Sequence, residues 1–96
     1  FRAEIWQTPP PGRWYFLTVP AALADEIDQR TTGLQGGFGS VKVQVELGAT
    51  TWTTSIFPSR EKESFILPLK RAVREAADCS AGDTVTVTLT LVGLET

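Results

Sequence analysis

The chain alternates between apolar and polar residues over several short stretches, and this is the period of strands that bury one face. The alternation is most regular in residues 41–47 and 83–92, where Val or Leu occupies every second position. Four further stretches are rich in the β-branched and aromatic residues that favour strands, namely residues 1–6, 14–19, 51–57 and 64–67. The pattern therefore predicts six strands.

Two other segments have apolar residues at helical spacing, and each follows a proline, a residue that suits the first turn of a helix. Pro20 begins a predicted helix over residues 21–30, and Pro68 begins a second one over residues 69–78. The apolar face of the first helix is expected to comprise Leu23, Ala24 and Ile27. The apolar face of the second is expected to comprise Leu69, Ala72, Val73 and Ala76. The predicted order of elements is β-β-α-β-β-β-α-β.

This order predicts a fold that is mainly β, with two short α-helices. Alternating strands favour a curled antiparallel sheet over a buried parallel one, so we expect a small antiparallel β-barrel of about six strands, split or closed. The length of 96 residues suits a single domain over residues 1–96. Four glycines between residues 33 and 39 predict a linker, because a phosphate-binding loop would need a strand before it and a helix after it.

Composition narrows the function chiefly through the residues that the chain lacks. It contains no His and a single Cys, Cys79, so the usual zinc sites and nucleophiles activated by His are excluded. We therefore expect no catalytic residues, no metal and no cofactor. The net charge of −2 argues against a general nucleic-acid binder, since such domains are usually basic. The lone Cys and the lack of a long apolar stretch favour a soluble cytoplasmic protein without a membrane span.

Several short motifs occur in a distinctive order along nearly the whole chain. They are Trp14-Tyr15-Phe16, Val19-Pro20, the 41–47 strand, Trp52-Thr53-Thr54-Ser55-Ile56-Phe57-Pro58, Leu67-Pro68-Leu69-Lys70, Val73-Arg74 and Gly82-Asp83-Thr84-Val85. In this order they resemble the domain of unknown function family 1905 (DUF1905), in its stand-alone form. The resemblance implies a small split β-barrel, similar in architecture to the AbrB-type transcription regulators. It implies no activity and no catalytic residues.

Polar groups within two of these motifs form the candidate ligand site. Trp52, Thr54 and Ser55 place hydroxyls beside an aromatic ring, which is typical of a ligand pocket. The alternative is a strand whose hydroxyls face water. Arg71 and Arg74 carry guanidinium groups that suit a carboxylate or phosphate. The alternative is a solvated helix face with ion pairs to nearby carboxylates, and in both cases the structural alternative is favoured.

Other polar and aromatic residues have simpler interpretations. Asp83 follows Gly82 and is expected to cap the turn into the last strand by accepting backbone hydrogen bonds. Cys79 is expected to be a small, partly buried residue at the end of a helix. The three tryptophans are expected to pack in the core or at its rim, at Trp6, Trp14 and Trp52.

These observations leave three functions open. The first is a non-enzymatic binding or interaction module, monomeric or homodimeric, with an unknown protein partner. The second is a small-molecule binder or enzyme that recognises an anionic ligand through residues 52–55 and the two arginines of the second helix. The third is nucleic-acid binding by analogy with AbrB-type barrels, against which the acidic charge counts. A single pocket that unites Trp52, Ser55, Arg71 and Arg74 would support the second function, and separate faces would oppose it.

Overall fold

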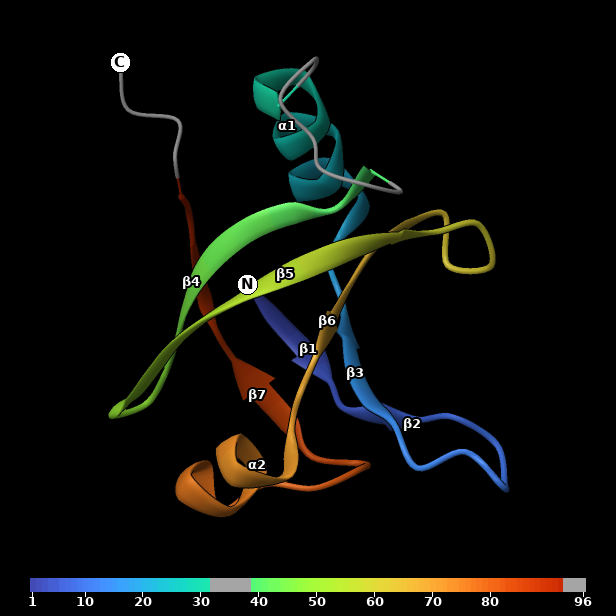
Figure 1. Ribbon diagram of the computed structural model, residues 1–96, viewed down its shortest axis with the longest axis vertical. Helices are drawn as coiled ribbons and strands as arrows, with labels where there is room; N and C mark the ends of the chain where they lie inside the picture. Colours follow the sequence, from blue (N-terminus) through green and yellow to red (C-terminus); the bar gives the residue numbers. More distant parts are fainter. Residues whose placement is uncertain (32–38, 93–96) are drawn as a thin grey trace.

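The computed structural model describes residues 1–31 and 39–92, and its elements follow the predicted order (Figure 1). The strands of the first half are β1 (Arg2–Glu4), β2 (Trp6–Gln7), β3 (Tyr15–Thr18) and β4 (Val41–Leu47). Those of the second half are β5 (Thr50–Ser59), β6 (Ser64–Pro68), β7 (Thr84–Thr86) and β8 (Thr88–Leu91). The helices are α1 (Ala21–Thr31) and α2 (Arg71–Ala77). Apart from Gly39, the predicted glycine linker lies outside the described residues.

The first and last predicted strands are each divided by one buried residue. Ile5 separates β1 from β2, and Val87 separates β7 from β8, so the described residues form eight strands where six were predicted. The backbone stays paired at both divisions. The Ile5 N–H donates to the Asp83 carbonyl over 2.8 Å, and the Val87 N–H donates to the Phe1 carbonyl over 2.8 Å. Each long strand therefore bends without losing its hydrogen bonds.

The strands form two antiparallel sheets, and neither sheet is closed. One sheet pairs β1 with β7, and the other has the order β2-β3-β6-β5-β4-β8. The bends at Ile5 and Val87 divide each long strand between the two sheets, because β1 and β7 lie in one sheet and β2 and β8 lie in the other. The mainly β fold with antiparallel sheets and two helices is confirmed, whereas a closed barrel is not.

The core follows the alternation that the sequence shows. On β4, Val41, Val43, Val45 and Leu47 are buried, while the residues between them are exposed or half-buried. The predicted inward side of the last strand is also confirmed, since its Thr residues are exposed, whereas Val85, Val87, Leu89 and Leu91 pack against the core. The buried apolar residues form one cluster, namely Ile5, Leu17, Val19, Ala24, Ile27, Val41, Val43, Val45, Leu47, Ile56, Phe65, Leu67, Leu69, Val73 and Val87.

Helix α1 lies close to the predicted bounds and ends one residue later. Ala24 and Ile27 are buried and Leu23 is half-buried, which confirms the predicted apolar face. Thr31 extends this face by one turn. Its side chain is buried, and its hydroxyl donates to the Ile27 carbonyl over 2.7 Å.

Helix α2 begins at Arg71, and the prediction that Pro68 opens it is wrong. Pro68 instead ends β6, where it lies opposite Phe16. The next residue continues the strand pairing, because the Leu69 N–H donates to the Tyr15 carbonyl over 2.8 Å. Leu69 therefore lies before the helix and not on its apolar face.

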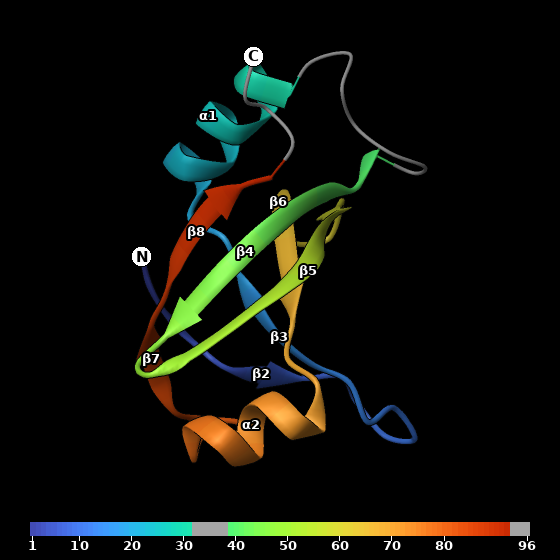
Figure 2. The same cartoon turned by 60° about the vertical axis from the view of Figure 1, so that its left-hand side comes forward.

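The predicted apolar face of α2 is therefore only half correct. Leu69 and Val73 are buried, but Ala72 and Ala76 are exposed. Figure 2 shows α1 and α2 at opposite ends of the strands. Within the described residues, no helix is long and apolar enough to cross a membrane.

Candidate functional site

A hollow of about 650 Å³ lies on the outer side of β3, β5 and β6, away from the core. The loop between β2 and β3 supplies one wall, and the residue before α2 supplies another. We call it the aromatic hollow. Its lining consists of three aromatic rings, other apolar residues, four hydroxyls and one ammonium group, namely Thr8, Trp14, Phe16, Thr53, Thr54, Ser55, Phe57, Ile66, Pro68 and Lys70.

Strand pairing explains why apolar residues line the outside of the sheet here. Leu17 of β3 and Leu67 of β6 lie opposite each other and are fully buried. Since successive residues of a strand point to opposite faces, Phe16 and Ile66 point outward. In the next strand pair, Ile66 lies opposite Phe57, which is 42% exposed. The outer faces of three neighbouring strands therefore form one apolar floor.

Trp14 is the most exposed ring of this hollow, with 63% of its surface accessible to water. It stacks against Phe16, with 6.4 Å between ring centroids and 16° between ring planes. The loop that carries it is held by two bonds to Thr8. The Trp14 N–H donates to the Thr8 hydroxyl over 3.3 Å, and the Thr8 N–H donates to the Trp14 carbonyl over 3.0 Å.

Gly12 makes this loop geometry possible. A Cβ at this position would collide with the side chain of Thr8, which is the residue that holds Trp14. The loop therefore holds the backbone of Trp14 where its ring is exposed. Exposed apolar surface of this kind is typical of a site that binds something.

A second hollow of about 280 Å³ adjoins the first on the side of α2. We call it the basic hollow, because three guanidinium groups and one ammonium group line it. Its lining consists of Arg13, Trp14, Tyr15, Pro68, Leu69, Lys70, Arg71 and Arg74. Trp14, Pro68 and Lys70 belong to both hollows. An aromatic surface and a cluster of cations therefore meet along a shared wall.

The two arginines of α2 are held differently. The Arg74 guanidinium lies over the Tyr15 ring, 3.7 Å from its centroid, and its Nε donates to the Leu69 carbonyl over 3.1 Å. It thus ties the start of α2 to β3. The Arg71 Nε donates to the Glu75 carboxylate over 2.7 Å, but both side chains are largely exposed, at 82% and 65%. Arg71 can therefore exchange this partner for another anion at little cost.

The structure distributes the candidate residues from the sequence over both hollows. Thr54 and Ser55 line the aromatic hollow, and Arg71 and Arg74 line the basic hollow. Trp52 lines neither of them. It is half-buried, packs against the core and lies opposite Val45. The candidates therefore do not converge in a single pocket, although the hollows that hold four of them are adjacent.

The sequence did not indicate that Trp14 and Lys70 lie together on the wall that joins the hollows. Trp14 was expected to pack in the core or at its rim, yet it is the most exposed of the large apolar side chains among the described residues. A signal was present, because residues 14–17 are apolar on both sides of the strand. Leu17 points inward, and side chains alternate along a strand, so an apolar residue three positions earlier has to point outward. Lys70 belongs to the same basic cluster of the sequence as Arg71 and Arg74, but nothing in the sequence places it beside Trp14.

Asp83 and Cys79 have the structural roles that the sequence indicated. The Asp83 carboxylate accepts a hydrogen bond from the Ser80 N–H over 2.9 Å, which caps the turn. Burial raises the pKa of the Cys79 thiol, the charge of Asp83 raises it further, and Arg74 opposes this in part. The thiol is therefore neutral at pH 7 and a poor nucleophile. The described residues contain no group of three or more potential metal ligands.

Comparison with protein families shows where the chain belongs. No curated protein matches the sequence. Residues 1–89 match the family described as a domain of unknown function, DUF1905. This match covers most of the 96 residues and confirms the resemblance that the ordered motifs indicated. The chain therefore belongs to the DUF1905 family.

Proposed function

We propose that this domain is a non-enzymatic binding module for an anionic ligand with a planar, apolar body. The body would occupy the aromatic hollow, and the anionic group would lie at Lys70, beside the basic hollow. The observation that carries the proposal is the wall of Trp14, Pro68 and Lys70 that both hollows share. This wall lets one small molecule contact both surfaces.

The physical basis is the exposure of Trp14 and Phe57. Covering an aromatic ring with a second planar group removes apolar surface from water, and stacked pairs add about 0.5–1.5 kcal/mol beyond burial. The hydroxyls of Thr8, Thr53 and Ser55 line the same hollow and can orient polar groups of the ligand. The backbone at Trp14 is already held by two hydrogen bonds to Thr8, so a ligand would not have to order this loop.

Charge supports an anionic ligand. Among the described residues, Arg71 pairs with Glu75, whereas no ion pair joins Lys70 to a carboxylate. Lys70 also lies at the wall between the hollows, where it can reach a group bound in either. The chain has no His, the side chain that most often transfers protons near neutral pH. The lining therefore favours holding an anion over transferring protons.

A second candidate is a short single strand of nucleic acid. Aromatic rings beside cations are the combination that binds such strands without sequence preference. The cations of the basic hollow favour a nucleic-acid ligand, whereas the net charge of −2 of the whole chain opposes one. Binding that depends on oligonucleotide length and falls steeply with salt would support it, whereas binding of the small anionic probe alone would support the first proposal.

Titration with two fluorescent probes tests the proposal. One is the aromatic sulfonate 8-anilinonaphthalene-1-sulfonate, and the other is its neutral analogue N-phenyl-1-naphthylamine. We expect Trp14→Ala to weaken both probes about tenfold or more, a change of about 1.4 kcal/mol. Lys70→Ala should weaken only the sulfonate. Val92→Ala and Lys42→Ala are matched controls, because both residues are exposed and line neither hollow. Equal affinities in all five proteins would contradict the proposal.

A further inference from the structure

The outer face of β2 and β3 carries a row of three aromatic rings that begins at the aromatic hollow and runs beyond it. Trp14 stacks on Phe16, and the Trp6 ring packs on Phe16 with 5.0 Å between centroids and 34° between ring planes. The indole Nε1–H of Trp6 donates to the Thr18 hydroxyl over 2.9 Å. Since Thr18 lies two residues after Phe16 and Trp14 lies two residues before it, the row follows β3 from Trp14 to Trp6.

Lys62 ends this row on the side away from Trp14. Its ammonium lies over the Trp6 ring, 4.5 Å from the centroid. It follows Glu61 and precedes Glu63 in the chain, but among the described residues no ion pair joins Lys62 to a carboxylate. Glu63 instead lines a different hollow, beside α1. Lys62 therefore presents a positive charge that an aromatic ring holds and no carboxylate neutralises.

An apolar strip separates Lys62 from Lys70. Lys70 lines the aromatic hollow together with Trp14 at one end. At the other end, Lys62 lies over the indole that is bonded to Thr18. From Trp14 to Thr18 the chain advances four residues, which is about 13 Å at the usual rise of a strand. The apolar floor of the aromatic hollow lies between these ends, so the sheet presents two ammonium groups, one at each end of an apolar strip.

We propose that the ligand of this domain is an elongated dianion, with a flat apolar body and an acidic group at each end. The inference rests on the proposed function and adds a second anion site at Lys62 to the one at Lys70. The body would lie along the strip and cover its exposed apolar surface. A lysine already held over an aromatic ring loses less side-chain freedom on binding an anion than a free one does. The ligand class is therefore planar bis-acids.

Two fluorescent probes with the same body test the second anion site. Stilbene-4,4′-dicarboxylate has a carboxylate at each end, and stilbene-4-carboxylate has only one. We expect Lys62→Ala to weaken the dicarboxylate about threefold or more. The monocarboxylate should change little, because its single acid binds at Lys70 beside the basic hollow. Lys62→Arg should retain most of the affinity for the dicarboxylate, since it keeps the charge and can still lie over the ring.

Lys42→Ala is the matched control, because it removes the same charge from an exposed residue that lines neither hollow. The proposed function fails if neither Trp14→Ala nor Lys70→Ala weakens the monocarboxylate. Where both do, a loss of dicarboxylate affinity in Lys62→Ala that is no larger than in Lys42→Ala overturns the second anion site alone. Tighter binding of hexathymidylate than of the dicarboxylate would overturn the assignment to a small dianion in favour of single-stranded nucleic acid.

Discussion

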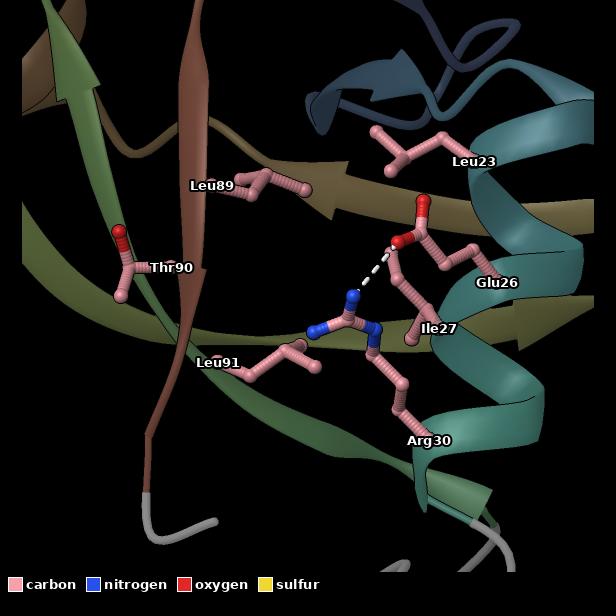
Figure 3. Close-up of a pocket in the computed structure, with 7 residues that line it drawn as sticks. All are labelled: Leu23, Glu26, Ile27, Arg30, Leu89, Thr90 and Leu91. Atoms are coloured by element: carbon pink, nitrogen blue, oxygen red, sulfur yellow. Dashed lines mark ion pairs between the residues drawn. The ribbon is translucent and has the colours of Figure 1, made fainter. Parts of the chain in front are cut away.

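The aromatic hollow differs from a groove between α1 and β8, which we call the α1–β8 groove (Figure 3). Both contain apolar side chains beside charged ones, and the groove is lined by Leu23, Glu26, Ile27, Arg30, Leu89, Thr90 and Leu91. In the hollow, Trp14 is 63% exposed, and Lys70 has no carboxylate partner among the described residues. In the groove, Glu26 and Arg30 neutralise each other, and the open groups belong to the backbone of β8. Apolar lining alone therefore does not identify a ligand. The nature of the unpaired polar groups does.

The largest expected effect separates a buried residue beneath the groove from an exposed one in the hollow. Ile27 is 3% exposed and Phe57 is 42% exposed. We expect Ile27→Ala to lower the free energy of unfolding by about 2–5 kcal/mol. Phe57→Ala should cost about 1 kcal/mol or less, because little of its packing is lost. Urea denaturation measures both values. Similar losses for the two variants would contradict the distinction between the buried Ile27 and the exposed Phe57.

The two arginines of the basic hollow should differ by a smaller amount. Arg74 contacts the Tyr15 ring and the Leu69 carbonyl, so Arg74→Ala should cost about 1–2 kcal/mol of stability. Arg71 is exposed, and among the described residues its ion pair is with Glu75, so Arg71→Ala should cost less than about 0.5 kcal/mol. Thermal or urea unfolding of the pair checks this. A larger loss for Arg71→Ala would show that the assignment of the anchoring arginine is reversed.

The ion pair at the groove should matter least. The Glu26 and Arg30 side chains are 54% and 65% exposed, and pairs of this kind on a helix contribute about 0.3–0.5 kcal/mol. We therefore expect Glu26→Gln to lower the free energy of unfolding by no more than about 0.5 kcal/mol at low salt. The difference should vanish in high salt. A large loss that persists in salt would give the pair a structural role that its exposure does not suggest.

Local alternation was enough to predict most of the fold. The pattern on β4 and on the last strand correctly indicated which residues face the core. The bends at Ile5 and Val87 could not be predicted, because both residues are apolar and continue the alternation without a break. They result from pairing between the two ends of the chain, and such pairing leaves no local pattern.

The candidate site was predicted only in part, for a related reason. Thr54, Ser55, Arg71 and Arg74 do line hollows, but Trp52 packs against the core. The wall that joins the hollows depends on the pairing of β3 with β6, which brings Trp14 next to Lys70 across more than fifty residues of sequence. The outward direction of Trp14 could have been inferred from the inward position of Leu17. The position of Lys70 could not, because it depends on where α2 begins.

The most direct test of the proposed binding site is to map 8-anilinonaphthalene-1-sulfonate onto the protein by NMR. The three tryptophan indole N–H signals serve as separate reporters for Trp6, Trp14 and Trp52. We predict that the Trp14 signal and the backbone amides of Phe57 and Lys70 shift on titration, while Trp52, Leu89 and Leu91 do not. Shifts confined to Leu89 and Leu91, or shifts at Trp52 without any at Trp14, would contradict the account.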